Sequence, residues 1–213
     1  MPNKNTIDLK IDMPVLERRK QKQKGISSDC QFNKIYPPSI QLLAQRHWTP
    51  LDVAIKAADF LAAENNVSIL DIGSGVGKFC LAAANHKPNA FFTGVEQRIS
   101  LIRHAETAKE LFHLKNVSFI KGNFTQIDFR NYDHFYFFNA FYENLEGTVK
   151  IDNSIDYSRE LYNYYCRYLY KQLQQKPSGT RLTTFHSLED EIPPEYHEVG
   201  VEMEGLLKFW IKI

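Results

Sequence analysis

The segment of this sequence best suited to chemistry is an acidic residue followed by alternate glycines. Residues 71–78 read DIGSGVGK, between an apolar run typical of a buried strand (67–70) and one typical of a helix (79–84). Glycine tolerates positive φ and lets a ligand approach bare backbone. Free N–H groups at the start of a helix favour anionic groups. The segment therefore predicts a ligand-binding loop, and its candidate binding residues are Asp71, Gly73, Ser74, Gly75 and Gly77.

A second acidic residue, Glu96, directly follows the next predicted strand, 90–95. Nucleoside-binding α/β folds place a carboxylate at about this distance after the glycine loop. The two oxygens of a carboxylate can accept hydrogen bonds from the vicinal hydroxyls of a ribose. Loop and carboxylate together predict a nucleoside cofactor, with Glu96 at its ribose.

The elements that must position these residues alternate between strand and helix from residue 68 onward, which is typical of a parallel sheet covered on both faces. The predicted strands are 68–70, 90–95, 117–120, 134–138 and 181–185, and the helices between them include 76–85, 99–113 and 154–174. Two last strands, 196–202 and 206–213, have a short connection and predict an antiparallel hairpin. We therefore expect a three-layer αβα sandwich around a mostly parallel, seven-stranded sheet with a C-terminal antiparallel hairpin.

Composition limits the possible classes of protein. The chain has 213 residues, of which 43% are hydrophobic, and a formal net charge of +1. One globular domain is expected, with no membrane-spanning run, no signal peptide and no metal site. Three widely spaced cysteines fit a reducing cytoplasm. The basic run 17–24 reads as a solvated arm, although contact with nucleic acid or an acidic substrate is a second interpretation. We expect an arm over 1–35 and a domain over 36–213.

A helix start is predicted at residues 49–52, after a short helix over 39–45. Thr49 is the expected N-cap, Pro50 the first helical residue, and Asp52 an acidic residue three positions after the cap.

The glycine spacing distinguishes between cofactors. Dinucleotide folds use G-x-G-x-x-G, whereas this loop has G-x-G-x-G with Asp71 two places before Gly73. That form resembles motif I of the class I, seven-strand S-adenosylmethionine-dependent methyltransferases. The resemblance implies that the loop holds the methionine end of the cofactor, with Asp71 near its amino group. The terminal hairpin also matches the sheet of this family, and dinucleotide folds lack it.

Two further cofactor contacts follow from the same resemblance. Gly122-Asn123-Phe124 lies where the family often has Gly-Asp and reads the adenine amino group. The carbonyl of Asn123 can still accept from that amine, and Phe124 either stacks on the adenine or anchors the loop. Thr49 lies at a helix start that often covers the cofactor carboxylate in this fold.

The acceptor side is predicted at Asn139-Ala140-Phe141-Tyr142. This segment resembles the Asn-Pro-Pro-Tyr motif of amino-methyltransferases, with both prolines replaced. The motif implies that Asn139 accepts a hydrogen bond from the target amine and that Tyr142 packs on the target. Support of the cofactor is the alternative role for Asn139. Glu143 is a candidate proton acceptor.

The glycine loop, residues 94–96 and residues 122–124 are together similar to the catalytic core of the non-SET histone-lysine methyltransferases, and the small chain resembles uncharacterised bacterial methyltransferases. We expect a cytoplasmic, S-adenosylmethionine-dependent enzyme acting on nitrogen, with a protein lysine or another amine favoured as acceptor. A small-molecule or RNA methyltransferase is the alternative. Outside the class stand an NAD-binding oxidoreductase and a non-catalytic cofactor-binding module. The acceptor and the oligomeric state stay open.

Overall fold

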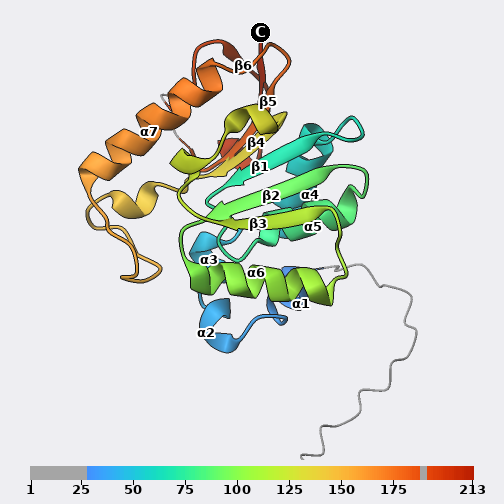
Figure 1. Cartoon of the computed structure of the whole chain (residues 1–213), viewed down its shortest axis with the longest axis vertical. Coiled ribbons are helices and arrows are strands. Elements are labelled where there is room, and N and C mark those ends of the chain that lie inside the picture. Colours follow the sequence, from blue (N-terminus) through green and yellow to red (C-terminus); the bar gives the residue numbers. More distant parts are fainter. Residues whose placement is uncertain (1–27, 188–190) are drawn as a thin grey trace, which may run out of the picture.

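The computed structural model describes residues 28–187 and 191–213. Its centre is one seven-stranded sheet with the order β3-β2-β1-β4-β5-β7-β6 (Figure 1). The strands are β1 Ser68–Ile72, β2 Phe91–Glu96, β3 Val117–Lys121, β4 His134–Phe138, β5 Arg181–Phe185, β6 Tyr196–Glu202 and β7 Leu207–Lys212. Every predicted strand is present, with its ends within two residues of the prediction.

Five strands run parallel, and β7 is antiparallel to both β5 and β6. The predicted terminal hairpin is thus confirmed, with β7 inserted between β5 and β6. In the register, Ile72 pairs with Val95 of β2 and with Phe137 of β4. Parallel strands carry their carboxyl ends to the same edge of the sheet, so the residues after β1, β2 and β4 meet there.

Helices cover both faces of the sheet, as predicted (Figure 1). They are α1 Asp29–Asn33, α2 Pro38–Gln41, α3 Ala44–His47, α4 Leu51–Leu61, α5 Lys78–His86, α6 Ile99–Leu111 and α7 Arg159–Gln174. Ile69 of β1 packs in the core cluster shared with α4 and α5, whereas Leu70 packs in the cluster shared with Leu169 of α7. This alternation is what a strand buried on both faces requires.

Two helices begin later than the sequence predicts. The expected helix 76–85 begins at Lys78, because Gly77 has the left-handed φ of 78°. The expected helix 154–174 begins at Arg159, where the Ser158 hydroxyl accepts the Leu161 N–H at 3.1 Å. Residues 154–157 instead form part of the segment that leads into the site, where the Tyr157 hydroxyl is 2.6 Å from Arg98.

The predicted N-cap at Thr49 is wrong. Helix α4 begins at Leu51, and its N-cap position, Pro50, makes no side-chain cap bond. The Leu51 N–H instead donates to the Asp29 carboxylate at 3.1 Å. Thr49 is buried, with its hydroxyl 3.0 Å from that of Tyr136. A distant carboxylate therefore supplies the N-terminal hydrogen bond, and Thr49 is left to face the site.

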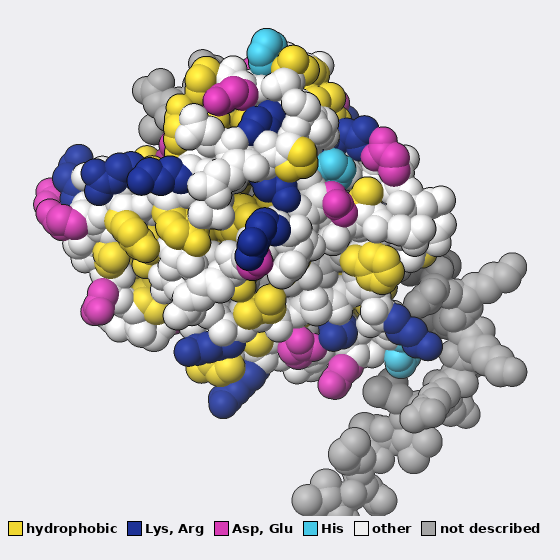
Figure 2. All heavy atoms as spheres, turned by 45° about the horizontal axis from the view of Figure 1, so that its top comes forward, with side chains coloured by type: hydrophobic (Ala, Val, Ile, Leu, Met, Phe, Trp, Pro, Cys, Tyr) yellow, Lys and Arg dark blue, Asp and Glu magenta, His cyan; other side chains and the backbone are white. Residues whose placement is uncertain are grey.

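The last residues of the predicted arm are part of the folded core. Phe32 of α1 is fully buried, and the Asp29 carboxylate pairs with Lys78 at the start of α5. The basic run 17–24 lies outside the described residues. On the face shown in Figure 2, basic and acidic side chains are interspersed. Among the described helices, none has the length and apolar character needed to cross a membrane.

Candidate active site

The glycine loop is a tight turn at the carboxyl end of β1. Gly73 and Gly77 have φ values of 80° and 78°. The N–H groups of Gly73 and Ser74 both donate to the Val95 carbonyl at 3.0 Å, which fastens the loop to β2. A Cβ on Gly73 would lie 2.4 Å from that of Ala140. Glycine is required at this position for both conformation and space.

The three glycines have different surroundings. Gly77 is packed, because a Cβ there would lie 2.4 Å from the Phe119 ring. Gly75 has a φ of 55° and no atom within 4 Å of the position of a Cβ. Its N–H donates to Glu96 at 3.2 Å. Gly75 therefore offers bare backbone to a ligand, whereas Gly77 serves the packing of α5.

Asp71 is 4% exposed, and the Cys80 thiol donates to it at 3.4 Å. Burial, with a contribution from the charge of Glu96, raises the pKa of Asp71 to about 7. Asp71, Thr49 and Ser74 line a small cavity of ≈ 30 Å³. The Ser74 Oγ is buried with no hydrogen-bond partner among the described residues. These groups form the polar end expected for the methionine part of the cofactor.

Glu96 lies at the end of β2 beside Arg98, which the sequence analysis missed. The Arg98 N–H donates to Glu96 Oε1 at 2.9 Å, and Nη1 lies 3.4 Å from the same oxygen. Burial raises the pKa of Glu96, opposed by the hydrogen bonds from Arg98 and Gly75. Burial would lower the pKa of Arg98, but Glu143 and Glu96 raise it above its usual range. The carboxylate retains lone pairs for a diol.

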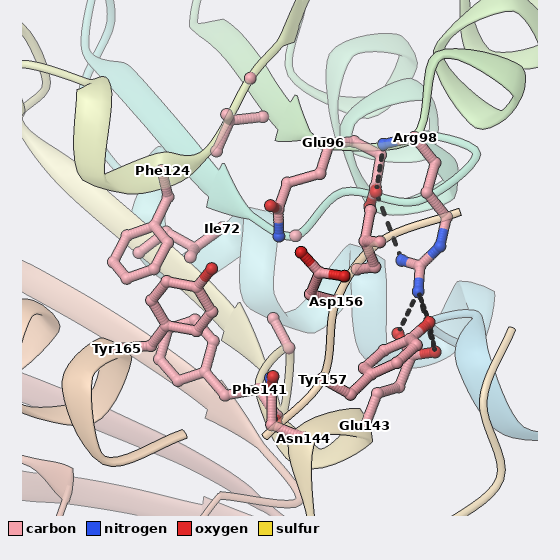
Figure 3. A pocket seen from close by; sticks show the side chains of 16 residues that line it. Ile72, Glu96, Arg98, Phe124, Phe141, Glu143, Asn144, Asp156, Tyr157 and Tyr165 are labelled. Carbon is pink, nitrogen blue, oxygen red and sulfur yellow. Dashed lines mark hydrogen bonds and ion pairs between the residues drawn. The ribbon is translucent and has the colours of Figure 1, made fainter. Parts of the chain in front are cut away.

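The Arg98 side chain also holds the segment after β4 (Figure 3). Its Nη2 lies 2.9 Å from both Glu143 oxygens and 2.6 Å from the Tyr157 hydroxyl. Its Nε lies 3.2 Å from Asp152, which Figure 3 does not draw. A residue two positions after Glu96 reads locally as the start of an exposed helix. Only the fold brings residues 143–157 onto it, so no local sequence signal identifies this role.

The predicted nucleoside end of the site is narrow. Figure 3 shows Phe124, Phe141 and Tyr165 on one side and Arg98 with Glu143 on the other. Phe124 stacks on Phe141, with ring centroids 4.9 Å apart. The cavity between these groups measures ≈ 40 Å³. Phe124 therefore lines the predicted adenine position, while its ring is also part of an aromatic cluster.

Asn123 is occupied by structural hydrogen bonds. Its carbonyl accepts from the Thr125 N–H at 3.1 Å, and its amide donates to Tyr165 at 2.7 Å and Gln97 at 3.2 Å. It caps the short 3-10 helix Phe124–Gln126. A contact from Asn123 to adenine stays a prediction, and these bonds compete with it.

The expected acceptor residues line one large cavity of ≈ 720 Å³. Asn139 follows β4 with a left-handed φ of 41°. Tyr142 is 50% exposed. Glu143 reaches the cavity but is bound by Arg98 and by the Ile151 N–H, at 2.6 Å. Gly73, Gly75 and Glu96 line the same cavity, so the structure brings the predicted cofactor and acceptor residues together. Gly77 and Asn123 line none of the three cavities described above.

Comparison with known proteins identifies the family. Over residues 63–200, more than half of the chain, the sequence matches the methyltransferase domain family. The chain belongs to this family. Its S-adenosylmethionine cofactor, expected from the sequence, agrees with that membership. A comparison with curated proteins gave no match.

Solved methyltransferases have the same fold at low identity. TrmN from Thermus thermophilus has a TM-score of 0.56 and 18% identity, over 86% of this chain and 53% of TrmN. An RNA methyltransferase from Salinibacter ruber, in complex with S-adenosylhomocysteine, has a TM-score of 0.51 and 20% identity, and the match covers 78% of this chain and 93% of that enzyme. Precorrin-6y C5,15-methyltransferase from Geobacter metallireducens GS-15 has a TM-score of 0.51 and 14% identity, and the match covers 79% of this chain and 90% of that enzyme. The finer resemblance to histone-lysine enzymes is not confirmed.

The residues of this methyltransferase fit the cofactor. Gly75 opens onto free space, and the large cavity lies within the ~300–1,000 Å³ typical of ligand sites. Asp71 and Ser74 supply polar groups at one end, and Glu96 supplies carboxylate oxygens along the cavity. When bound, S-adenosylmethionine supplies an electrophilic methyl group on a sulfonium. The chain must then hold and orient the acceptor.

Proposed function

We propose that this protein is an S-adenosylmethionine-dependent methyltransferase that transfers the methyl group to nitrogen. The observation that carries the proposal is the position of Asn139. It follows β4 at the edge of the sheet, lines the large cavity with Gly73 and Glu96, and its amide makes no hydrogen bond to the described residues. A free amide carbonyl beside the cofactor loop suits the N–H of an acceptor.

The roles assigned to the cofactor residues complete the proposal. Asp71, Thr49 and Ser74 hold the methionine end, Glu96 accepts from the ribose hydroxyls, and Phe124 lies beside the adenine. Gly73 and Gly75 give the backbone its close approach. The support for this assignment is that these residues line cavities that meet at Gly73.

The acceptor we favour is an amine, including the lysine side chain of a protein. Tyr142, half exposed at the mouth of the cavity, would pack on the target. A small molecule or an RNA is the alternative acceptor within the class.

Transfer of tritiated methyl from S-adenosylmethionine to lysate, fractionated into protein, RNA and small molecules, tests the proposal. We expect label in one fraction, stable to mild base, as methylated amines are and methyl esters are not. Label lost in base would contradict transfer to nitrogen. Absence of label in every fraction, with S-adenosylhomocysteine still bound, would favour a non-catalytic cofactor-binding module.

The melting temperature distinguishes a methyltransferase from the remaining alternative, a nucleotide-binding oxidoreductase. S-adenosylhomocysteine should raise it, because a ligand that binds only the folded state stabilises that state by mass action. NADH should not change it. The reverse result would favour a nucleotide-binding oxidoreductase.

A further inference from the structure

Two polar residues lie side by side at the carboxyl ends of β4 and β5. The last residues of these parallel strands, Phe138 and Phe185, are paired in the register. The residues that follow them are Asn139 and His186, with φ values of 41° and 55°. Left-handed backbone is uncommon outside glycine, and such conformations gather at functional sites. Here two residues with left-handed backbone directly follow adjacent strands and line the same cavity.

The two side chains provide free polar atoms to that cavity. Both Asn139 and His186 line it, and neither side chain has a hydrogen-bond partner among the described residues. The carboxylates there are engaged: Glu143 accepts from Arg98 through both oxygens, and Glu96 accepts from Arg98 and Gly75. Glu143 is therefore poorly placed to take a proton from an acceptor.

The His186 ring is positioned by apolar packing. Its centroid lies 4.4 Å from that of Phe185 in an edge-on arrangement and 5.7 Å from that of Phe138. Its backbone N–H donates to the Leu206 carbonyl at 3.0 Å. These contacts hold the residue without using a ring nitrogen, and the ring remains exposed to the cavity.

We propose that His186 accepts the proton released in methyl transfer and that Asn139 orients the acceptor nitrogen beside it. This inference rests on the proposed function. The acceptor nitrogen forms a bond to the methyl carbon while the carbon–sulfur bond breaks and leaves its electron pair on sulfur. The N–H proton of the acceptor passes to the unprotonated ring nitrogen of His186. The acceptor is therefore a nitrogen that carries hydrogen, such as a primary or secondary amine, and not a tertiary amine.

The electrostatic surroundings agree with an unprotonated ring at neutral pH. Burial lowers the pKa of His186 from its ordinary value of 6.5. The titratable or charged groups of the surrounding elements are Arg46 and His47 of α3, Glu96 at the end of β2 and Arg98 after it, Tyr142 and Glu143 after β4, and Glu202 and Glu204 beside Leu206. His47 is the rival proton acceptor, because it lines the same cavity and burial lowers its pKa too.

The test replaces His186 by asparagine, which tolerates left-handed backbone but cannot take up the proton. His113 offers a matched control, because it has a φ of 54° and is exposed at the end of α6. With tritiated S-adenosylmethionine and the lysate fraction that the wild type labels, His186→Asn should slow labelling about 100-fold, within the ~10²–10⁴ typical of general bases. His113→Asn should label within twofold of the wild type, and both variants should bind S-adenosylhomocysteine as the wild type does.

Proton NMR titration of the histidine rings gives a second readout, with the His186 signal assigned from its loss in His186→Asn. Its midpoint should lie below pH 6.5 and coincide with the acid limb of the wild-type rate profile. A rate within twofold of wild type, or an acid limb that disappears in His47→Asn instead, would overturn the inference. If the wild type labels no fraction, the proposed function fails, and this inference fails with it. If the wild type labels a fraction and His186→Asn labels it at the same rate, this inference alone is overturned.

Discussion

The carboxylate of Glu143 meets the guanidinium of Arg98 through both of its oxygens, each 2.9 Å from Nη2. The same guanidinium contacts Glu96 and Tyr157. One cation, whose side chain is only 4% exposed, thereby joins the predicted ribose carboxylate at the end of β2 to the segment between β4 and α7. Arg98 therefore braces the wall of the cavity predicted to hold the nucleoside.

Replacing Arg98 by alanine should reduce the free energy of unfolding by about 3–5 kcal/mol, because it leaves buried carboxylates without their partner. Denaturation in urea measures this loss, and hydrogen exchange should show faster opening of residues 143–157. Arg130 is a matched control, since its pair with Asp128 is exposed, and Arg130→Ala should leave stability unchanged. Equal effects of the two substitutions would contradict the role of Arg98.

Glu96→Ala should weaken the binding of S-adenosylhomocysteine roughly ten- to a hundredfold, because a hydrogen bond to a charged group contributes ~1.5–3 kcal/mol. Calorimetric titration measures the affinity. The control is Glu110→Gln, at an exposed carboxylate of α6. Since Glu96 also receives the Gly75 N–H, Glu96→Gln should retain part of the loop geometry and lose less affinity than the alanine variant. An unchanged affinity in Glu96→Ala would rule out the ribose assignment.

Asp71 should make stability depend on pH. Its carboxyl has a pKa of about 7 in the folded protein, against an ordinary value of 3.8, so the folded state binds the additional proton between these two pH values. The free energy of unfolding should therefore fall as pH rises from about 4 to 7, by up to about 4 kcal/mol, and this contribution should be constant above pH 7. Asp71→Asn removes the ionisation and should be more stable than the wild type at pH 8 but about equal to it below pH 4, where the carboxyl is protonated in both the folded and the unfolded state.

The same residue should link cofactor binding to proton release. The cationic amino group of S-adenosylmethionine beside Asp71 favours the ionised carboxylate, so binding at pH 6 should release a proton and tighten toward pH 7. Calorimetry in buffers of different ionisation enthalpy counts the proton. Asp71→Asn should bind more weakly and release none. Proton release that persists in this variant would assign the titration to another group.

The sheet was predictable because its signals are local. Each strand of the parallel set is a short apolar run bounded by turn residues, and Gly73, Gly75 and Glu96 lie where strands end. The order of these segments along the chain was enough to predict the cofactor loop beside the ribose carboxylate. The hairpin was readable for the same reason.

The predictions that failed were those that depended on tertiary contacts. Thr49 has a good local capping sequence, but Asp29, which lies 22 positions before Leu51, supplies the hydrogen bond to the Leu51 N–H. The sequence predicts Tyr157 as part of a helix, but in the structure it lies before the helix and its hydroxyl accepts a hydrogen bond from Arg98. His186 has no signal in its own segment, because its position beside Asn139 depends on the pairing of β4 with β5. Local patterns predict elements, whereas partners distant in sequence decide which side chains are free.

Asn139 allows strain and chemistry to be separated with two substitutions. Its φ of 41° costs glycine nothing but costs alanine about 1–2 kcal/mol. Asn139→Gly should therefore unfold with at least the wild-type free energy, and Asn139→Ala should be destabilised by about that amount. Both lose the amide carbonyl, so both should slow labelling of the acceptor fraction about tenfold or more while binding S-adenosylhomocysteine almost normally. Wild-type labelling by Asn139→Gly would show that the amide does not serve the acceptor, and an equal loss of cofactor affinity would make Asn139 a cofactor residue.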